Sequence, residues 1–199
     1  LVGRQEQLTR LQSIWQQARH GDTQVVLLQG EAGIGKSRLV HAFRQQIAGQ
    51  PHVVRVLHCS AESAQSPWQP VLALLANQFG FTPGDSPRAR TRKLADHVAA
   101  AHPAGVQEAV GLLRELYALP PTDSHPPPAA AKALQRHRVT ALLGALLRQP
   151  AGGLPLVLVT EDLHWADAST LELLQSLAGP QARGALMAVF TARPGFALP

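Results

Sequence analysis

The sequence has 199 residues, of which 45% are hydrophobic and 16% are charged. This composition excludes a disordered chain, and the length suffices for a substantial core. The formal net charge of +5 raises the question of nucleic acid, but only 5% of the residues are aromatic and they do not interleave with the basic clusters, so stacking platforms for single strands are not evident.

The longest apolar runs are of strand length, far below the roughly 20 residues that cross a bilayer, and nothing resembles a signal peptide. Cys59 is the only cysteine, which excludes an internal disulfide and makes a reducing cytoplasm the expected location. Because the chain opens on Leu1 rather than Met, we expect it to be a piece of a longer protein.

The first predicted element is an amphipathic helix over 6–18, with apolar residues at helical spacing. A short apolar strand follows over 23–30 and ends in glycine. A second helix, beginning at about Lys36, carries Leu39, Val40, Phe43 and Ile47 on one face. Another strand is predicted over 53–59, which completes a strand–helix–strand unit.

The middle of the chain, residues 60–153, predicts a largely helical insert. Helices are expected over 68–79, 88–101, 106–117 and 129–148, and the proline-rich tract at 119–130 reads as a solvated loop. The basic clusters at 88–93 and 136–138 are interpreted as solvated helix faces, and Trp15 and Trp68 as packing residues.

Regular strand–helix alternation resumes after the insert. An apolar strand is predicted over 154–162, a helix over 169–180, and a fourth strand within 184–195. Ser169 and Glu172 have the spacing of a capping box at the start of that helix. Four apolar strands alternating with helices predict an α/β fold in which the middle helices pack as an insert.

The stretch GEAGIGKS, Gly30 to Ser37, matches the pattern G-x-x-x-x-G-K-[ST] at every fixed position. Glycines allow successive backbone N–H groups to converge on a phosphate, and the following helix adds the positive end of its dipole. Lys36 would hold the β- and γ-phosphates and Ser37 would ligate Mg²⁺. A glycine-rich turn without a ligand is the alternative, but a strand before the loop and a helix after it favour the phosphate site.

Two adjacent carboxylates, Glu161 and Asp162, end the apolar strand LVLVTED. One would hold Mg²⁺ and the other would orient or deprotonate the attacking water. Read alone, they also fit the acidic start of a helix. Together with the phosphate-binding loop they predict a Mg²⁺–nucleotide site, in which we favour Glu161 as the metal ligand.

Four stretches carry a family resemblance: LVGRQEQLTRL, GEAGIGKSRLV, LVTEDLHWADASTLELL and TARP. They resemble the NTPase domain of the STAND branch of AAA-related P-loop ATPases, as found in large LuxR-like transcriptional regulators and in proteins with nucleotide-cyclase or kinase domains. This resemblance implies a P-loop NTPase three-layer sandwich, α/β with a mostly parallel sheet and an inserted helical segment, as a single domain over 1–199. Many relatives carry Asp–Asp where this chain has Glu161 and Asp162.

The resemblance also implies roles for individual residues. Gly30–Ser37 would be the Walker A loop, Glu161 with Asp162 the Walker B pair, and Arg193 a sensor of the γ-phosphate, although an arginine at a strand end could equally be a surface residue. His164 and Trp165 are interpreted as structural. The predicted nucleotide-binding set is Val2, Gly3, Arg4, Gly30, Glu31, Ala32, Gly33, Ile34, Gly35, Lys36, Ser37, Arg38 and Arg193. The predicted catalytic set is Asp162, Glu161 and Lys36, and the predicted metal ligands are Ser37, Glu161 and Asp162.

The expected function is a cytoplasmic, slowly hydrolysing ATP·Mg²⁺ switch in signal transduction or transcriptional regulation. Its expected partners are ATP or ADP, adjacent domains of the same protein and a second copy on activation, without membrane contact and without direct nucleic-acid contact. Three alternatives stay open: a non-hydrolysing ATP-binding scaffold, a DNA-contacting basic module whose affinity would fall steeply with salt, and a small-molecule kinase.

Overall fold

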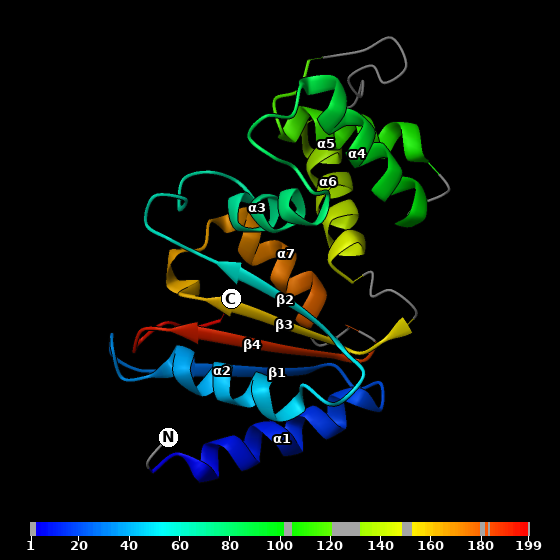
Figure 1. Cartoon of the computed structure of the whole chain (residues 1–199). Coiled ribbons are helices and arrows are strands. Elements are labelled where there is room, and N and C mark those ends of the chain that lie inside the picture. Colours follow the sequence, from blue (N-terminus) through cyan, green and yellow to red (C-terminus); the bar gives the residue numbers. More distant parts are fainter. Residues whose placement is uncertain are drawn as a thin grey trace. The chain divides into compact units, whose positions relative to one another are not determined.

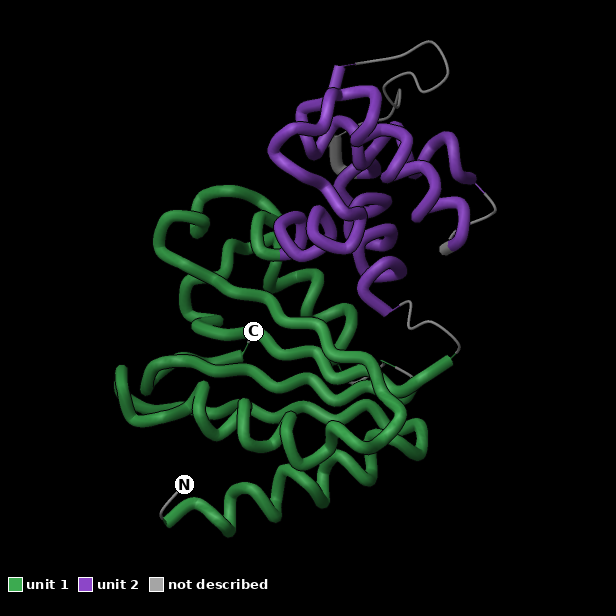
Figure 2. The backbone as a smooth tube through the Cα atoms, viewed as in Figure 1, with its two compact units in different colours: residues 1–70, 150–199 green, residues 71–149 purple. Residues whose placement is uncertain are grey.

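The computed structural model describes residues 3–101, 105–120, 132–148, 153–179, 182 and 184–198. The chain divides into two compact units, one formed by residues 1–70 with 150–199 and the other by residues 71–149 (Figure 2). Residues 60–70 of the predicted insert thus belong to the first unit. That the two units form a single domain stays a prediction.

The first unit contains a parallel sheet of four strands: β1 (Gln24–Gln29), β2 (Val53–His58), β3 (Leu156–Glu161) and β4 (Leu186–Ala192). The strands lie in the order β1-β4-β3-β2 (Figure 1). The two central strands, β3 and β4, are buried along almost their whole length, as their continuous apolar sequences predict for strands covered on both faces.

Helices cover both faces of this sheet. On one face, α1 (Gln5–Arg19) and α2 (Lys36–Ile47) form a core with the strands. On the other face lies α7 (Ala168–Ala178), whose Leu174 lines an apolar cavity together with Val25 and Phe190. Those two residues alternate along their strands with the residues that face α1 and α2. The predicted α/β class with a three-layer arrangement is therefore confirmed.

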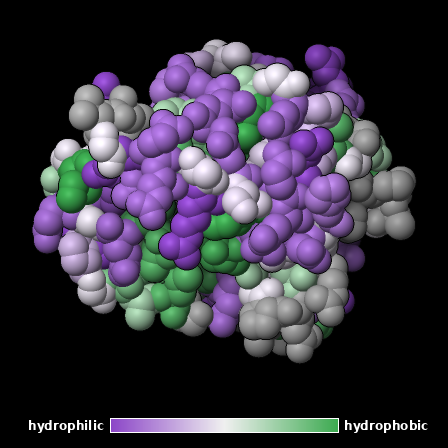
Figure 3. Space-filling model, turned by 90° about the horizontal axis from the view of Figure 1, so that it is seen from below, coloured by the Kyte–Doolittle hydropathy of each residue, from purple (hydrophilic) through white to green (hydrophobic). Residues whose placement is uncertain are grey.

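The first helix shows how the amphipathic pattern is used. Leu8, Leu11, Trp15 and Ala18 are buried, and the outer side of α1 is polar. Figure 3, which views the molecule from below, where α1 lies in Figure 1, shows a largely hydrophilic face. Trp15 is fully buried and its indole N–H donates to Oε1 of Gln50 at 2.6 Å, so the core residue predicted here has its polar group satisfied.

The second unit contains α3 (Gln69–Gln78) for the most part, α4 (Pro87–Ala101), α5 (Val106–Leu116) and α6 (Lys132–Arg148). The predicted helices agree with these bounds to within a few residues. The predicted start of the last helix at 129 and nearly all of the predicted loop at 119–130 lie outside the described residues. Trp68, just before α3, is buried as expected.

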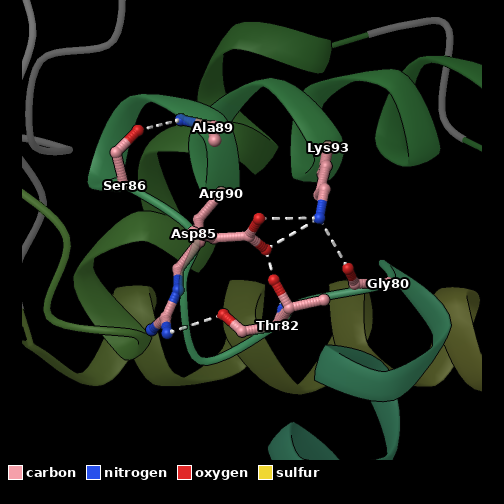
Figure 4. Close-up of polar contacts among 7 residues, drawn as sticks. All are labelled: Gly80, Thr82, Asp85, Ser86, Ala89, Arg90 and Lys93. Atoms are coloured by element: carbon pink, nitrogen blue, oxygen red, sulfur yellow. Dashed lines mark hydrogen bonds and ion pairs between the residues drawn. The ribbon is translucent and has the colours of Figure 1, made fainter.

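One basic cluster is more than a solvated face. Nζ of Lys93 donates to both carboxylate oxygens of Asp85, at 2.7 and 2.9 Å, and to the carbonyl of Gly80 at 2.7 Å (Figure 4). The hydrogen bond from Lys93 is the main cause that lowers the pKa of Asp85 from 3.8 to about 2. These hydrogen bonds from Lys93 therefore stabilise the loop that leads into α4.

Arg90 of the same cluster is also engaged. Its guanidinium lies over the ring of Phe81, 5.6 Å from the centroid. It also donates to the carbonyl of Thr82 at 3.4 Å (Figure 4). Arg88 and Arg92 are exposed. The solvated-face interpretation is thus right for these two residues and wrong for Arg90 and Lys93, because loop carbonyls and a carboxylate lie within their reach.

The start of α7 corrects a second prediction. The N-cap is Asp167 rather than Ser169: its carboxylate accepts from the backbone N–H groups of Ser169 at 2.9 Å and Thr170 at 3.0 Å. It also accepts from the Thr170 hydroxyl at 2.5 Å and from the backbone N–H of Trp68 at 3.4 Å. The helix begins earlier than the capping-box spacing indicates, because an aspartate at this position satisfies the first-turn donors.

Candidate functional site

The phosphate-binding loop leaves β1 and enters α2 as the sequence predicts. Gly33 and Gly35 have φ angles of 76° and 92°, in the left-handed region that strains any side chain. Gly35 is the N-cap of α2, and no side chain caps that helix end. The first-turn N–H groups of α2 are therefore presented at the end of the loop, where an anion can accept from them.

Lys36 lies folded over this loop. Its Nζ donates to the carbonyl of Gly30 at 2.7 Å and to that of Glu31 at 3.0 Å. These are neutral acceptors, so a phosphate brought into the loop would compete for the ammonium group as a stronger, charged partner. The loop motif predicts that this lysine contacts the β- and γ-phosphates.

The N-terminal segment reaches the same loop. The Arg4 guanidinium donates a hydrogen bond to the backbone carbonyl of Ile34. This contact spans 30 residues of sequence and brings Arg4 onto the phosphate-binding loop. Gly3 lies next to it, whereas Val2 is outside the described residues. The Ile34 side chain is exposed.

The parallel sheet brings the other predicted residues to the same edge. Because all four strands run in one direction, their carboxyl ends meet there. Along this edge the loop follows β1, Arg193 follows β4, Glu161 and Asp162 end β3, and His58 ends β2. Strand β4 lies between the loop strand and the acidic strand, an order that the local sequence patterns do not reveal.

The two acids have different surroundings. Glu161 is partly buried, and its Oε2 lies 3.0 Å from Nδ1 of His58, the residue beside it in the β2–β3 register. Asp162 has a left-handed backbone with φ of 54°, and its N–H donates to the Thr191 hydroxyl of β4 at 3.0 Å. Glu161 thus points toward β2, while the backbone of Asp162 is tied toward β4, the side on which the phosphate-binding loop lies.

The turn after the acids carries His164 and Trp165. Residues Leu163–Trp165 form a 3₁₀ turn, with Leu163 buried. The Arg193 guanidinium lies over the exposed Trp165 ring, 5.9 Å from its centroid. Burial lowers the pKa of His164, the charge of Asp162 raises it, and the charges of Arg193 and Lys36 lower it further. Charged groups that follow β1, β3 and β4 thus all affect the pKa of this imidazole.

The same edge also holds the only cysteine. Cys59 follows His58 and is buried. Burial, with smaller contributions from the charges of Asp167 and Asp162, raises the pKa of its thiol to about 12. Cys59 is thus a neutral thiol at physiological pH and not a nucleophile.

The donors at this edge fit a magnesium ion that arrives with a nucleotide. Ser37 and Asp162 are exposed, and within the described residues the Asp162 carboxylate has no hydrogen-bond or ion-pair partner. The described residues contain no group of three or more His, Cys, Asp or Glu side chains that could hold a metal by themselves. Mg²⁺ is usually held by one or two carboxylates together with substrate phosphates and water, so such a cage is not needed.

The structure thus brings together the predicted residues Gly3, Arg4, Gly30–Ser37, Asp162 and Arg193 at one edge, with Arg38 exposed in the first turn of α2 and Glu161 turned toward β2. His58 was not predicted as a partner of Glu161. The signal available was weak: a polar residue at the end of a strand indicates a contact only once the neighbouring strand is known. In the described parts of the chain, no helix combines the length and apolar character that a membrane crossing requires.

The chain is similar to known proteins. A family model described as AAA ATPase domain matches residues 1–189. An uncharacterized protein of Rhizobium meliloti (strain 1021) is 30% identical over 199 residues, covering 99% of this chain but only 19% of the relative's length. A solved structure of the ORC1 protein of Aeropyrum pernix in complex with DNA is similar over 98% of this chain and 40% of that chain, with 16% identity and a TM-score of 0.47. The chain belongs to the AAA ATPase domain family of P-loop proteins.

Proposed function

We propose that this chain binds ATP with Mg²⁺ at the carboxyl edge of its sheet, hydrolyses it slowly, and acts as a regulatory switch within a larger cytoplasmic protein. The observation that carries the proposal is the position of Lys36. Its ammonium group donates to the carbonyls of Gly30 and Glu31 in the glycine-rich loop, and no side chain caps the helix that follows the loop. Bound phosphates would replace those carbonyls as its partners.

The roles follow from the positions of the side chains. The backbone of Gly30–Ser37 would cradle the phosphates, Ser37 and a carboxylate would complete the Mg²⁺ shell, and Arg193 would contact the γ-phosphate. Asp162 is the better placed metal ligand, since its backbone is tied to β4 and its carboxylate has no other partner in the described residues. Glu161 would then orient the attacking water after leaving His58. This reverses the assignment of Glu161 to the metal that the sequence favours.

The larger context is also a proposal. The family resemblance supports an STAND-type module of a signalling protein, such as a LuxR-like transcriptional regulator or a cyclase- or kinase-linked protein, that passes its nucleotide state to adjacent domains or to a second copy. The matched relative is about five times the length of this chain, which supports further domains in such proteins. A switch requires that ATP and ADP favour different conformations.

A second candidate, a scaffold that binds ATP without turnover, is favoured by one observation. The Glu161 carboxylate is engaged by His58 at 3.0 Å, so one of the two acids is not free for chemistry. In that case the nucleotide would only stabilise the fold by mass action.

Calorimetric titration with ATP and ADP in the presence of Mg²⁺ tests the site. We expect Lys36→Ala to weaken binding by at least about tenfold, as loss of a charged hydrogen bond of roughly 1.5–3 kcal/mol implies. Arg88→Ala removes the same charge from an exposed position of α4 and should bind like the wild type. Unchanged affinity in Lys36→Ala would overturn the site.

Turnover separates the two candidates. Glu161→Gln and Asp162→Asn should each retain ATP binding, and at least one should lose phosphate release. If neither variant changes a measurable rate, the hydrolytic switch is rejected and the scaffold remains.

A further inference from the structure

Trp165 and Arg193 form a contact that the proposed roles do not use. Trp165 ends the 3₁₀ turn that follows the two acids, and 37% of its surface is exposed. The Arg193 guanidinium lies over the indole ring, 5.9 Å from its centroid. Trp15 and Trp68 are buried, so Trp165 is the tryptophan that is accessible at the surface, and a cation of the candidate site packs on it.

Backbone hydrogen bonds hold Arg193 beside the phosphate-binding loop. Strand β4 pairs with β1 in parallel, and the register sets Ala192 beside Gln29, the last residue of β1 (Figure 1). The N–H of Gly30, the first residue of the loop, donates to the carbonyl of Ala192 at 3.3 Å. The Gln29 side chain donates to the carbonyl of Phe196 at 2.5 Å. The backbone of Arg193, which lies between these two carbonyls in the chain, is therefore next to the start of the loop.

The turn that carries Trp165 is joined to the same strand. The N–H of Asp162 donates to the Thr191 hydroxyl of β4 at 3.0 Å, and the N–H of Trp165 donates to the carbonyl of Asp162 at 2.9 Å. An indole side chain has fewer rotatable bonds than an arginine, so the ring is the more rigid partner of the stacked pair. Trp165 therefore orders the side chain of Arg193, and both belong to segments that are held at the end of β4.

The stack uses only one of the two contact surfaces of a guanidinium. The planar face packs on an aromatic ring, while the N–H donors lie in the plane and point outward from its edge. In the described part of the chain, these donors of Arg193 have no hydrogen-bond or ion-pair partner. The edge of the guanidinium is consequently available for an anion such as phosphate, whose oxygens match its paired donors. An anion can bind there without breaking the stack.

We propose that Trp165 positions Arg193 for the terminal phosphate of ATP, by holding the guanidinium beside the loop with its donors free before the nucleotide binds. A long side chain that is already ordered loses less conformational freedom on binding, so the same contact gives a higher affinity. ADP lacks the phosphate that Arg193 would contact, so the effect is specific for ATP. The inference rests on the proposed nucleotide site and makes Trp165 a positioning residue within it.

Binding measurements with two nucleotides test the proposal. The full chain is titrated with Mg²⁺ and either a non-hydrolysable ATP analogue or ADP. Trp165→Leu keeps an apolar side chain but removes the aromatic face, whereas Trp165→Phe restores a smaller face. We expect Trp165→Leu to bind the ATP analogue about two- to fivefold more weakly and ADP like the wild type, with Trp165→Phe in between. The matched control is Phe81→Leu, which removes the ring under Arg90 in the other unit and should change neither affinity.

A double-mutant cycle shows whether Trp165 acts through Arg193. Arg193→Ala should weaken binding of the ATP analogue more than Trp165→Leu does, and combining the two substitutions should cause no further loss. A ring that only supports the fold would give different results, namely additive losses or equal losses for ATP and ADP. Either of these results would overturn the proposal.

The same measurements separate this inference from the proposed function. If Arg193→Ala weakens binding of the ATP analogue while Trp165→Leu binds it like the wild type, the inference is wrong and the site stands. If Arg193→Ala itself binds both nucleotides like the wild type, the inference is also wrong, together with the proposed role of Arg193. If the wild type binds neither nucleotide, the inference and the proposed function fall together.

Discussion

Removal of the Asp167 cap is the perturbation with the most definite expected effect on stability. Asp167→Ala deprives the backbone N–H groups of Ser169 and Thr170 of their acceptor, and an N-cap of this kind contributes about 1–2 kcal/mol. It also leaves the buried Thr170 hydroxyl without its 2.5 Å partner, for which about 1 kcal/mol or more is expected. The 3.4 Å contact from the Trp68 N–H adds little.

The expected loss in the free energy of unfolding is therefore about 3 kcal/mol. With a urea m-value of about 2 kcal/mol per molar, the midpoint should fall by about 1.5 M. Tryptophan fluorescence is a suitable probe, since Trp15, Trp68 and Trp165 all belong to the unit that contains the sheet and α7.

Two further variants serve as controls for Asp167→Ala. Asp167→Asn keeps an oxygen acceptor for the backbone donors and should lose only about 1 kcal/mol. Asp22→Ala, at an exposed position before β1, should stay within about 0.5 kcal/mol of the wild type. If Asp167→Ala unfolds at the same urea concentration as Asp22→Ala, the cap does not stabilise α7 and the reasoning fails.

Three other predictions follow from individual contacts. His58→Ala frees the partly buried Glu161 from its pair with an exposed histidine, a contact worth about 0–1 kcal/mol. Mg²⁺-dependent ATP binding should therefore stay equal or rise by no more than about fivefold, and a clear loss in titration would instead assign His58 a supporting role. Asp85→Asn should destabilise the chain at pH 7 and flatten the acid limb of its stability curve. The folded-state pKa of Asp85, about 2, lies below its ordinary 3.8, so its contribution is present above about pH 4 and is lost as the pH falls toward 2; urea midpoints across this range would contradict the prediction if both proteins lost stability in parallel. Cys59, buried and with a pKa raised to about 12, should react with a disulfide reagent far more slowly in the native chain at pH 8 than in denaturant, and equal rates would show that this edge is open to solvent.

Several features could be predicted from local sequence because they depend on contacts between near neighbours in the chain. The burial of Leu39, Val40, Phe43 and Ile47 on α2 follows from helical spacing. All four are buried in the structure, because this apolar face of the helix packs on the sheet. Gly33 and Gly35 have the positive φ angles that a phosphate-binding loop needs.

The errors have a common physical origin. Ser169 was expected to cap α7, but Asp167 two residues earlier gives the same donors a charged acceptor and also reaches Trp68, 99 residues away in the chain. Lys93 was expected to be solvated, but a loop carboxylate and a carbonyl lie within its reach. In both cases a competing partner decided the outcome, and spacing alone does not identify such partners.

The sequence by itself determined the helices and strands, the α/β class, the phosphate-binding loop and the pair of acids, since each depends on a local pattern of side chains. Only the tertiary structure decided the strand order, which places β4 between the loop and the acids. That order turns Glu161 toward His58 and ties the backbone of Asp162 toward β4. The physical reason is that pairing between parallel strands joins residues far apart in the chain, and neighbouring strands can be exchanged without altering any local pattern.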